Sequence, residues 1–213
     1  MQLCVEHGTG KSEKRMAISA KDVAELRRQT GVGMMECKKA LGEAGGDMEK
    51  ATDILRKRGM AKAEQRAGRT AREGMIGHYV HFNGKVGVLV DLNCETDFVA
   101  RTEDFQTLAK DLSLHIASAR PIAVSVDDLP EELVAKEREI IQAQVAESGK
   151  PEAVRGKITE GKMKKFCKGL VLLDQPFVRD DKVSVGQLVT EASVKLGEKV
   201  VVRRFVRYEL GEA

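Results

Sequence analysis

The sequence predicts an α+β fold: a small N-terminal three-helix module, then an antiparallel sheet packed with helices and a projecting helical hairpin. Three observations lead to this prediction. Residues 16–60 place apolar side chains at helical spacing between glycine interruptions. Two valine-rich stretches then flank Asn83-Gly84, which is typical of a β-hairpin. Residues 129–169 carry apolar residues at helical spacing on both sides of one short polar break.

The N-terminal module, residues 16–60, is predicted from signals that start and stop helices. A first helix follows Ser19, because Asp22 stands three residues further on and can complete a capping box. The second helix covers residues 34–44, and a third follows Asp47. Glycine is the most common residue just past a helix end. The expected ends of the three helices are Gly31, Gly45-Gly46 and Gly59.

Residues 61–72 are rich in alanine and charge and are expected to form a helical linker to an α+β core over residues 73–213. That core opens with the hairpin. A two-residue turn at Asn83-Gly84 is predicted because both residues tolerate positive φ. The turn fixes the register of strands 75–82 and 85–92, and one face must then be covered. The side chains predicted for that face are Met75, Tyr79, Val86, Val88, Val90 and Leu92.

The expected cover is a helix capped near Thr102, with residues 185–196 as a second candidate. The last strand, residues 199–210, is rich in β-formers and should join the sheet. The apolar positions of the first covering helix are Phe105, Leu108, Ala109, Leu112 and Ile116. Between these elements, helices 131–147 and 152–168 are predicted to pair. Their facing side chains are expected to be Val134, Ile141, Val145, Val154, Ile158 and Met163.

The composition favours a protein with a charged, soluble surface and a core built without tryptophan. The 213 residues are 42% hydrophobic but only 4% aromatic, and the net charge is +3. Residues 16–72 hold 13 Lys/Arg against 8 Asp/Glu, a balance of +5, whereas residues 73–213 hold 20 against 23, a balance of −3. This distribution suits a protein partner about as well as RNA. No apolar run approaches the roughly 20 residues of a membrane helix.

The four cysteines are far apart and are expected to be reduced thiols of a cytoplasmic protein. Residues 1–15 lack the apolar centre of a secretory signal and are expected to be a disordered leader or tag before a natural start at Met16. Within them, Gly10-Lys11-Ser12 matches the tail of a phosphate-binding loop. The first glycine of that motif would fall at Val5, so the match is rejected.

The search for enzyme chemistry gives no catalytic constellation, metal site or cofactor site. His78 and His81 have metal-like spacing, but residues three apart on a strand point to opposite faces. Nucleic-acid binding is the second class considered. Two basic clusters, residues 162–165 and Arg203-Arg204, could favour it, yet the net charge is small and no aromatic-rich strand offers a base-stacking surface.

Two places do not fit a purely structural interpretation. Consecutive methionines, Met34-Met35, start a helix, where neighbouring side chains point about 100° apart. Either one is exposed for a partner, or both fill gaps between the three helices. Phe98 lies in a polar connection after the hairpin and is not needed as a staple for the helix capped at Thr102. Its ring could face a partner or tuck beneath the sheet.

Two long segments settle which family the chain resembles. LRRQTGVGMMECKKAL, residues 26–41, and LNCETDFVA, residues 92–100, resemble the two signature segments of the elongation factor Ts family of bacterial translation factors. QPFV at residues 175–178 and the ending VVRRFVRYELGE are also similar. The resemblance runs from Ala17 to the C-terminus. One small departure is Asp91, where the family usually has glutamate.

The resemblance implies a guanine-nucleotide exchange factor that binds elongation factor Tu, displaces Mg²⁺ and promotes GDP release without covalent chemistry. The alternative is an RNA- or ribosome-associated binding protein without exchange activity. The resemblance also implies that the helical module is UBA-like. It places the Mg²⁺-displacing contact on Thr96, Asp97, Phe98 and Val99. It places contacts of the helical module on Arg27, Met34 and Met35, and a less specific contact on His115, Phe177 and Val178.

The chain resembles the short form of the family, because it has room for one sheet-containing subdomain where longer members have two. A core with only one such subdomain would leave a sheet edge and apolar surface exposed. Proteins usually cover an exposed sheet edge by pairing it with another chain or element. A homodimer that binds two partner molecules is therefore expected.

Overall fold

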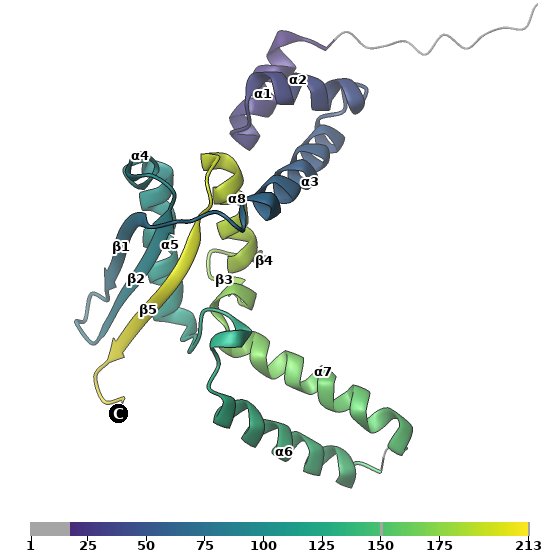
Figure 1. Ribbon diagram of the computed structural model, residues 1–213, viewed down its shortest axis with the longest axis vertical. Helices are drawn as coiled ribbons and strands as arrows, with labels where there is room; N and C mark the ends of the chain where they lie inside the picture. The colour runs from purple at the N-terminus through teal and green to yellow at the C-terminus, as the bar shows by residue number, and fades with distance from the viewer. Residues whose placement is uncertain (1–17, 150, 213) are drawn as a thin grey trace, which may run out of the picture. The chain divides into compact units, whose positions relative to one another are not determined.

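The computed structural model describes residues 18–149 and 151–212 of the chain (Figure 1). The chain divides into two compact units, which meet in sequence between Gly59 and Met60. The predicted leader and its rejected phosphate-loop match lie outside the described residues. No helix among the described residues is long and apolar enough to cross a membrane.

The first unit contains α1 (Ala20–Thr30), α2 (Met34–Glu43) and the start of α3 (Met48–Arg66). The predicted capping box is confirmed: Ser19 Oγ accepts from the Asp22 N–H, and the Ser19 N–H donates to the Asp22 carboxylate. Gly31 ends α1 with a φ of 67°. The three helices enclose a small core of Val23, Leu26, Cys37, Ala40, Leu41, Ala51 and Leu55.

The predicted helix end at Gly59 is wrong, because α3 continues through this buried glycine to Arg66. A glycine inside a helix costs about 1 kcal/mol relative to alanine, which does not end a helix continued by good helix formers. The following residues include Ala61, Lys62 and Ala63. The predicted linker is therefore helical only in its first half, and turns begin at Ala67.

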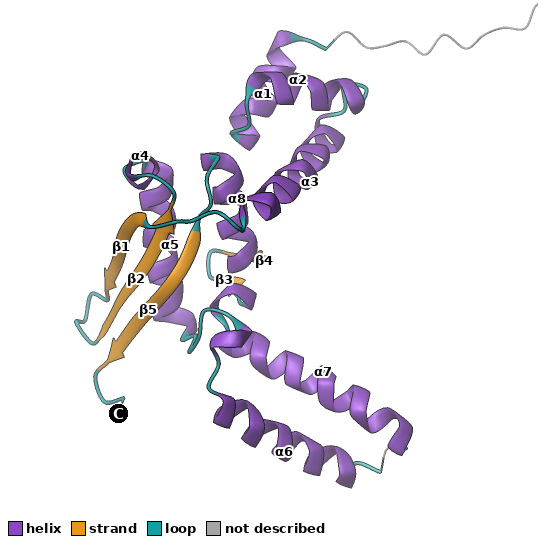
Figure 2. Ribbon diagram, viewed as in Figure 1, coloured by secondary structure: helices purple, strands orange, loops and turns teal. Residues whose placement is uncertain are grey.

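The second unit is built on a three-stranded antiparallel sheet in the order β1-β2-β5 (Figure 2). Its strands are β1 (Glu73–Val80), β2 (Val86–Cys94) and β5 (Val201–Glu209). The predicted hairpin register is confirmed, since Tyr79 pairs with Val88 and Met75 with Leu92. The final strand joins the other edge of β2, as expected.

The hairpin turn differs from the predicted two-residue type. The Gly84 N–H donates to the His81 carbonyl at 2.8 Å, and the His81 N–H donates to the Val86 carbonyl. Gly84 has a φ of 69°, but Asn83 is not among the described residues with positive φ. Asn83 Oδ1 instead accepts the Lys85 N–H at 3.0 Å, which stabilises a longer loop. The register survives because this loop is centred on the same two residues.

One face of the sheet is covered by α5 (Glu103–Ala119), as predicted, and Thr102 caps this helix. A Cβ built on Gly77 would lie 2.9 Å from the Ala109 carbonyl oxygen, so β1 and α5 meet without room for a side chain. The second candidate, α8 (Val185–Leu196), packs beside α5 and the 3-10 turn Leu172–Asp174. All five predicted apolar positions of α5 are buried in this core.

Two elements complete the second unit. A short two-stranded sheet, β3 (Pro176–Phe177) with β4 (Asp180–Ser184), was not predicted. The predicted helical hairpin is confirmed as α6 (Glu131–Glu147) and α7 (Glu152–Leu170). A 3-10 turn, Val126–Asp128, precedes it. The apolar layer between α6 and α7 contains Val134, Ile141, Val145, Ile158, Met163, Phe166 and Cys167. Val154, which was expected in this layer, is exposed because it lies at the start of α7, next to the connecting turn.

Candidate functional site

The turn after β2 presents Phe98 to solvent. Thr96 caps α4 (Asp97–Ala100), a single helical turn, with its hydroxyl oxygen accepting from the Val99 N–H at 3.5 Å. Val99 packs against the sheet core, whereas the Phe98 side chain is 79% exposed. The alternative that Phe98 tucks beneath the sheet is therefore wrong. Residues that follow one another in a helix point in different directions, so anchoring Val99 leaves Phe98 facing outward.

The start of this turn is held from within the core. The Cys94 thiol is buried at the end of β2 and donates to the Thr96 carbonyl oxygen at 3.1 Å. Burial raises the pKa of this thiol, and the negative charge of Glu198 raises it further, so the thiol stays protonated and remains a donor. Cys94, Cys37 and Cys167, the cysteines in the described part of the chain, form no disulfide.

Asp97 is paired on the surface of the same turn. Its carboxylate lies 2.8 Å from an Arg101 guanidinium nitrogen, one helical turn away. Exposed ion pairs of this kind are weak and exchange easily with other partners. Asp97 is thus held toward Arg101 by an interaction that a second protein could replace.

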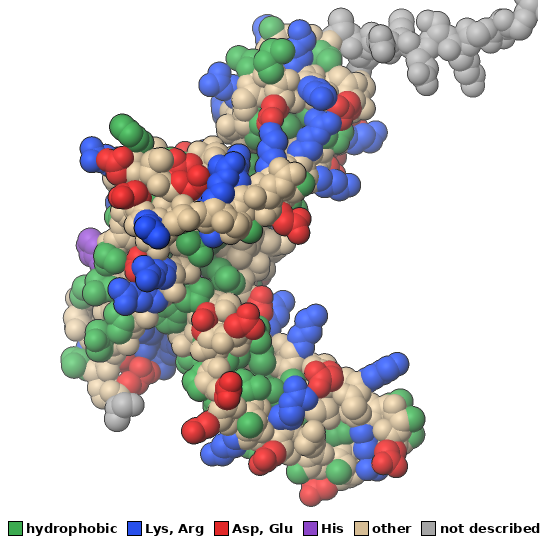
Figure 3. Space-filling model, viewed as in Figure 1, with side chains coloured by type: hydrophobic (Ala, Val, Ile, Leu, Met, Phe, Trp, Pro, Cys, Tyr) green, Lys and Arg blue, Asp and Glu red, His purple; other side chains and the backbone are tan. Residues whose placement is uncertain are grey.

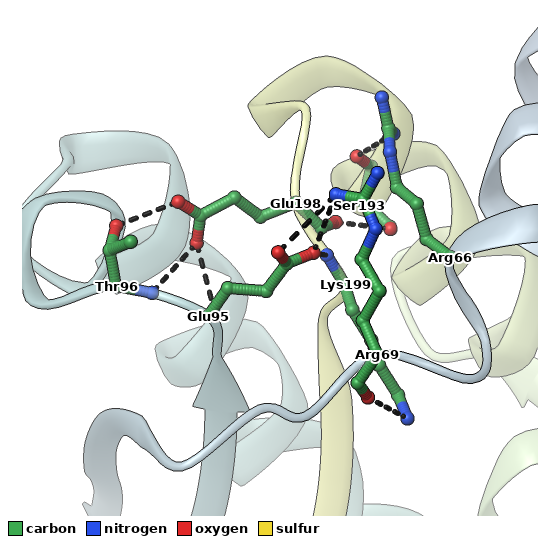
Figure 4. A network of polar contacts seen from close by, with 7 residues as sticks. All are labelled: Arg66, Arg69, Glu95, Thr96, Ser193, Glu198 and Lys199. Carbon is green, nitrogen blue, oxygen red and sulfur yellow. Dashed lines mark hydrogen bonds and ion pairs between the residues drawn. The ribbon is translucent and has the colours of Figure 1, made fainter.

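A network of polar contacts fixes the turn against the segment that follows α8 (Figure 4). The Glu198 carboxylate accepts hydrogen bonds from the backbone N–H groups of Glu95 and Thr96, each at 3.0 Å. It also accepts the Thr96 hydroxyl at 2.7 Å. The turn is therefore attached to a residue more than one hundred positions away in the sequence.

The carboxylate of Glu95, in the turn itself, accepts a hydrogen bond from the segment that follows α8. Glu95 accepts from the Lys199 N–H at 2.7 Å and lies 3.3 Å from an Arg69 guanidinium nitrogen. The Lys199 hydrogen bond is the main reason that the pKa of Glu95 lies below its usual value, and the charge of Arg69 adds to it. The Lys199 ammonium donates to the carbonyls of Ala67 and Arg69, so the segment after α3 joins the same network.

The helical unit exposes the other residues implied by the resemblance. Met34 and Met35, at the start of α2, are 45% and 76% exposed, and Arg27 on α1 is also exposed. The alternative that both methionines fill gaps between the helices is therefore wrong. Flexible thioethers on a surface suit contact with another protein.

The resemblance implied a partner contact at His115, but its side chain is fully buried. The Val178 N–H donates to His115 Nδ1 at 3.2 Å, so the ring proton is on Nε2, which donates to Gln175 Oε1 at 3.0 Å. Gln175 in turn donates to the carbonyls of Gly169 and Ala119. Burial lowers the pKa of His115, while the Gln175 hydrogen bond partly opposes this shift.

The other two residues of the less specific implied contact, Phe177 and Val178, lie next to His115. Phe177 is buried with its ring centroid 6.0 Å from that of His115, and Val178 is exposed. Of the three, only Val178 presents a substantial side-chain surface. His115 holds the backbone that carries Val178 and does not itself reach the surface.

The face of the sheet opposite α5 is open and partly apolar. The register places Ile76 and Val80 of β1 beside Leu89 of β2 on this face, and Tyr208 of β5 beyond them. All four side chains are exposed. Hydrophobic side chains gather over these strands, with lysine and arginine side chains among them (Figure 3).

Three of the residues that fix the turn were not predicted from the sequence: Arg69, Glu198 and Lys199. No local pattern could have revealed them, because their partners lie far away in the sequence. Of the two histidines with metal-like spacing, His81 has another partner, since its Nδ1 lies 2.9 Å from the Tyr79 hydroxyl. In the described part of the chain, no group of three or more His, Cys, Asp or Glu residues could hold a metal ion.

These features define an α+β protein whose sheet carries a fixed turn with an exposed aromatic side chain. A family model described as elongation factor TS matches residues 48–212. Elongation factor Ts of Moorella thermoacetica is 54% identical over 195 residues, which cover 92% of this chain and 96% of that protein. Elongation factor Ts of Desulforamulus reducens is 53% identical, with 92% and 90% covered. The chain therefore belongs to the elongation factor Ts family, a family of translation elongation factors.

Proposed function

We propose that this chain is a guanine-nucleotide exchange factor that binds elongation factor Tu, displaces its Mg²⁺ and promotes GDP release during translation elongation. The observation that carries the proposal is the position of Phe98: a large apolar ring, exposed on a turn that is fixed at both ends. Family membership supports the partner. An exposed ring on a fixed turn loses little conformational entropy on binding, which suits an anchor that enters an apolar crevice.

Exchange of this kind needs no covalent step. A factor that binds nucleotide-free elongation factor Tu more tightly than the GDP-bound form must weaken GDP binding by the same factor, because the two affinities are linked. In the proposed mechanism, Phe98 enters the partner near its metal site while Asp97 helps displace groups that organise Mg²⁺. Loss of the ion leaves the phosphates of GDP with less compensating charge.

The remaining surface residues extend this contact. Arg27, Met34 and Met35 would bind the nucleotide-binding domain of elongation factor Tu, and Val178 another of its domains. The open face of the sheet would pair with a second copy of this chain, giving a complex of two factors and two partners in the cytoplasm. We propose neither a cofactor nor a bound metal for the factor itself.

The proposal is tested by mixing the chain with elongation factor Tu that carries fluorescent GDP and following loss of the signal over time. Acceleration that rises with the concentration of the chain is expected. The alternative function predicts a different result: no acceleration, together with salt-sensitive retention of RNA in the absence of elongation factor Tu.

A further inference from the structure

Glu198 is connected to the Phe98 turn through three donors at the start of that turn. Its two carboxylate oxygens accept from different donors. Oε2 accepts both backbone N–H groups, from Glu95 and Thr96, and Oε1 accepts the Thr96 hydroxyl. The carboxylate therefore takes up the backbone and the side chain of the residue that caps α4 (Figure 4).

This contact determines how the Thr96 hydroxyl is oriented. An ionised carboxylate can only accept hydrogen bonds, so the hydroxyl proton must point toward Glu198. A lone pair of the same oxygen is then directed to the Val99 N–H, which it meets at 3.5 Å. That second bond is the cap of α4, the helical turn that carries Phe98. Glu198 thus acts on Phe98 through Thr96.

Glu198 is itself held in place from both sides. Gly197, with a φ of 75°, ends α8 immediately before it, and the Ser193 hydroxyl donates to the Glu198 carbonyl. The next residue, Lys199, donates its N–H to the Glu95 carboxylate. The two segments are therefore joined reciprocally. Glu198 accepts backbone N–H groups from the Phe98 turn, and Glu95 of that turn accepts the backbone N–H of Lys199.

We propose that Glu198 is a positioning residue for partner binding, which holds the Thr96–Val99 turn in the geometry that presents Phe98. This inference rests on the proposed exchange function. It assigns to Glu198 no contact with the partner. The function of the carboxylate is to make the turn rigid before the partner arrives, so that binding does not have to order it.

The test compares Glu198→Ala and Glu198→Gln with Glu160→Ala. Glu160 is a suitable control, because its exposed carboxylate is ion-paired with Arg138 in the helical hairpin and its removal changes the net charge equally. Two quantities are measured: stimulated release of fluorescent GDP from elongation factor Tu at subsaturating factor, and amide hydrogen exchange in the free chain.

For Glu198→Ala, stimulated release should slow about tenfold, the effect of roughly one lost charge-assisted hydrogen bond on an equilibrium. Amides at positions 95 to 99 should exchange faster, while the amides of β2 and α5 keep their protection. Glu198→Gln retains one acceptor oxygen and should show a smaller loss of both. Glu160→Ala should match the parent.

Two results would overturn the inference: unchanged release by Glu198→Ala, or slower release accompanied by loss of protection throughout the sheet. The second would indicate that Glu198 supports the fold in general. If the parent chain itself fails to accelerate release, the proposed function is wrong. The hydrogen-exchange comparison then still decides whether Glu198 holds the turn.

Discussion

Phe98 and Val99 are neighbours in one helical turn, yet one is exposed and the other contributes to the core. This contrast comes from the attachments on either side of them: Thr96 to Glu198, and Val99 to the sheet core. At the scale of single residues, the contacts of the neighbouring residues hold the proposed partner-binding side chain in an exposed position. Its own contacts within the chain are few.

Replacing Phe98 by alanine should slow stimulated GDP release at least about tenfold, since a central aromatic anchor typically contributes ~2 kcal/mol or more. The fold should be unaffected, because Phe98 is already 79% exposed. Stopped-flow fluorescence gives the rate, and thermal unfolding checks the fold.

Phe82 provides a matched control for this substitution. It is the other strongly exposed phenylalanine, 93% accessible in the hairpin loop. Phe82→Ala should leave the release rate near that of the parent. Equal rates for Phe98→Ala and Phe82→Ala would contradict the proposed role of the turn.

His115 predicts how stability depends on pH. Its pKa is lowered by burial, so the unfolded chain binds more protons than the folded chain as the pH falls below the ordinary histidine value of about 6.5. The contribution of neutral His115 is therefore complete above that pH and is lost as the pH falls. Protonation would also place a proton on Nδ1, where the Val178 N–H already donates.

We expect the parent to unfold at lower urea concentration at pH 5.5 than at pH 7.5. His115→Gln should be less stable than the parent at pH 7.5 but should lose less on acidification. His78→Gln, at an exposed strand position, serves as the control and should keep the pH response of the parent. An unchanged pH response in His115→Gln would show that another group is responsible.

At the scale of elements, the sheet and α5 approach so closely that only glycine fits between them. The Cβ of an alanine at position 77 would lie 2.8 Å from a Val90 methyl group and 2.9 Å from the Ala109 carbonyl oxygen. Gly77→Ala should lower the free energy of unfolding by about 1–3 kcal/mol, the usual cost of overfilling a packed core. Urea unfolding measures this change.

Gly87 in the neighbouring strand is the matched control. A Cβ at position 87 would meet nothing within 4 Å, because this residue faces the open side of the sheet. When both glycine substitutions are compared in the monomeric Leu89→Glu background, Gly87→Ala should be neutral or stabilise by about 0.5–1 kcal/mol, since alanine loses less backbone entropy than glycine in a strand. If both substitutions destabilise equally, the loss does not come from contact with α5.

At the scale of the whole molecule, the open face of the sheet is the surface most suited to self-association. Leu89 lies in the central strand of this face, with 48% of its side chain exposed. We expect sedimentation to give a dimer for the parent and a monomer for Leu89→Glu, because pairing through this face would remove the new charge from water.

Val126 tests whether the position of the charge matters. It is 50% exposed, almost as much as Leu89, but lies in a 3-10 turn outside the sheet. Val126→Glu should remain dimeric. A monomeric parent, or a dimer that survives Leu89→Glu, would refute pairing through this face.

The sequence by itself determined most of the helices, the three strands of the main sheet and the hairpin register. Ser19, Thr102 and Gly197 mark helix ends by hydrogen bonds or backbone conformations that involve only nearby residues. The register of β1 and β2 is likewise local, because it is centred on Asn83-Gly84 and places the apolar side chains on one face. The motif around Phe98 was recognisable as a resemblance, although its exposure was not.

Only the tertiary structure decided the rest. Gly59 resembles a helix end, but the residues on both sides favour helix strongly enough to continue through it. His115 was expected at a partner contact, yet residues far from it in the sequence supply its two hydrogen bonds, and its side chain is buried. The carboxylate of Glu198 meets the Phe98 turn across more than one hundred residues. Such contacts depend on how the chain packs, and no local pattern of residues encodes them.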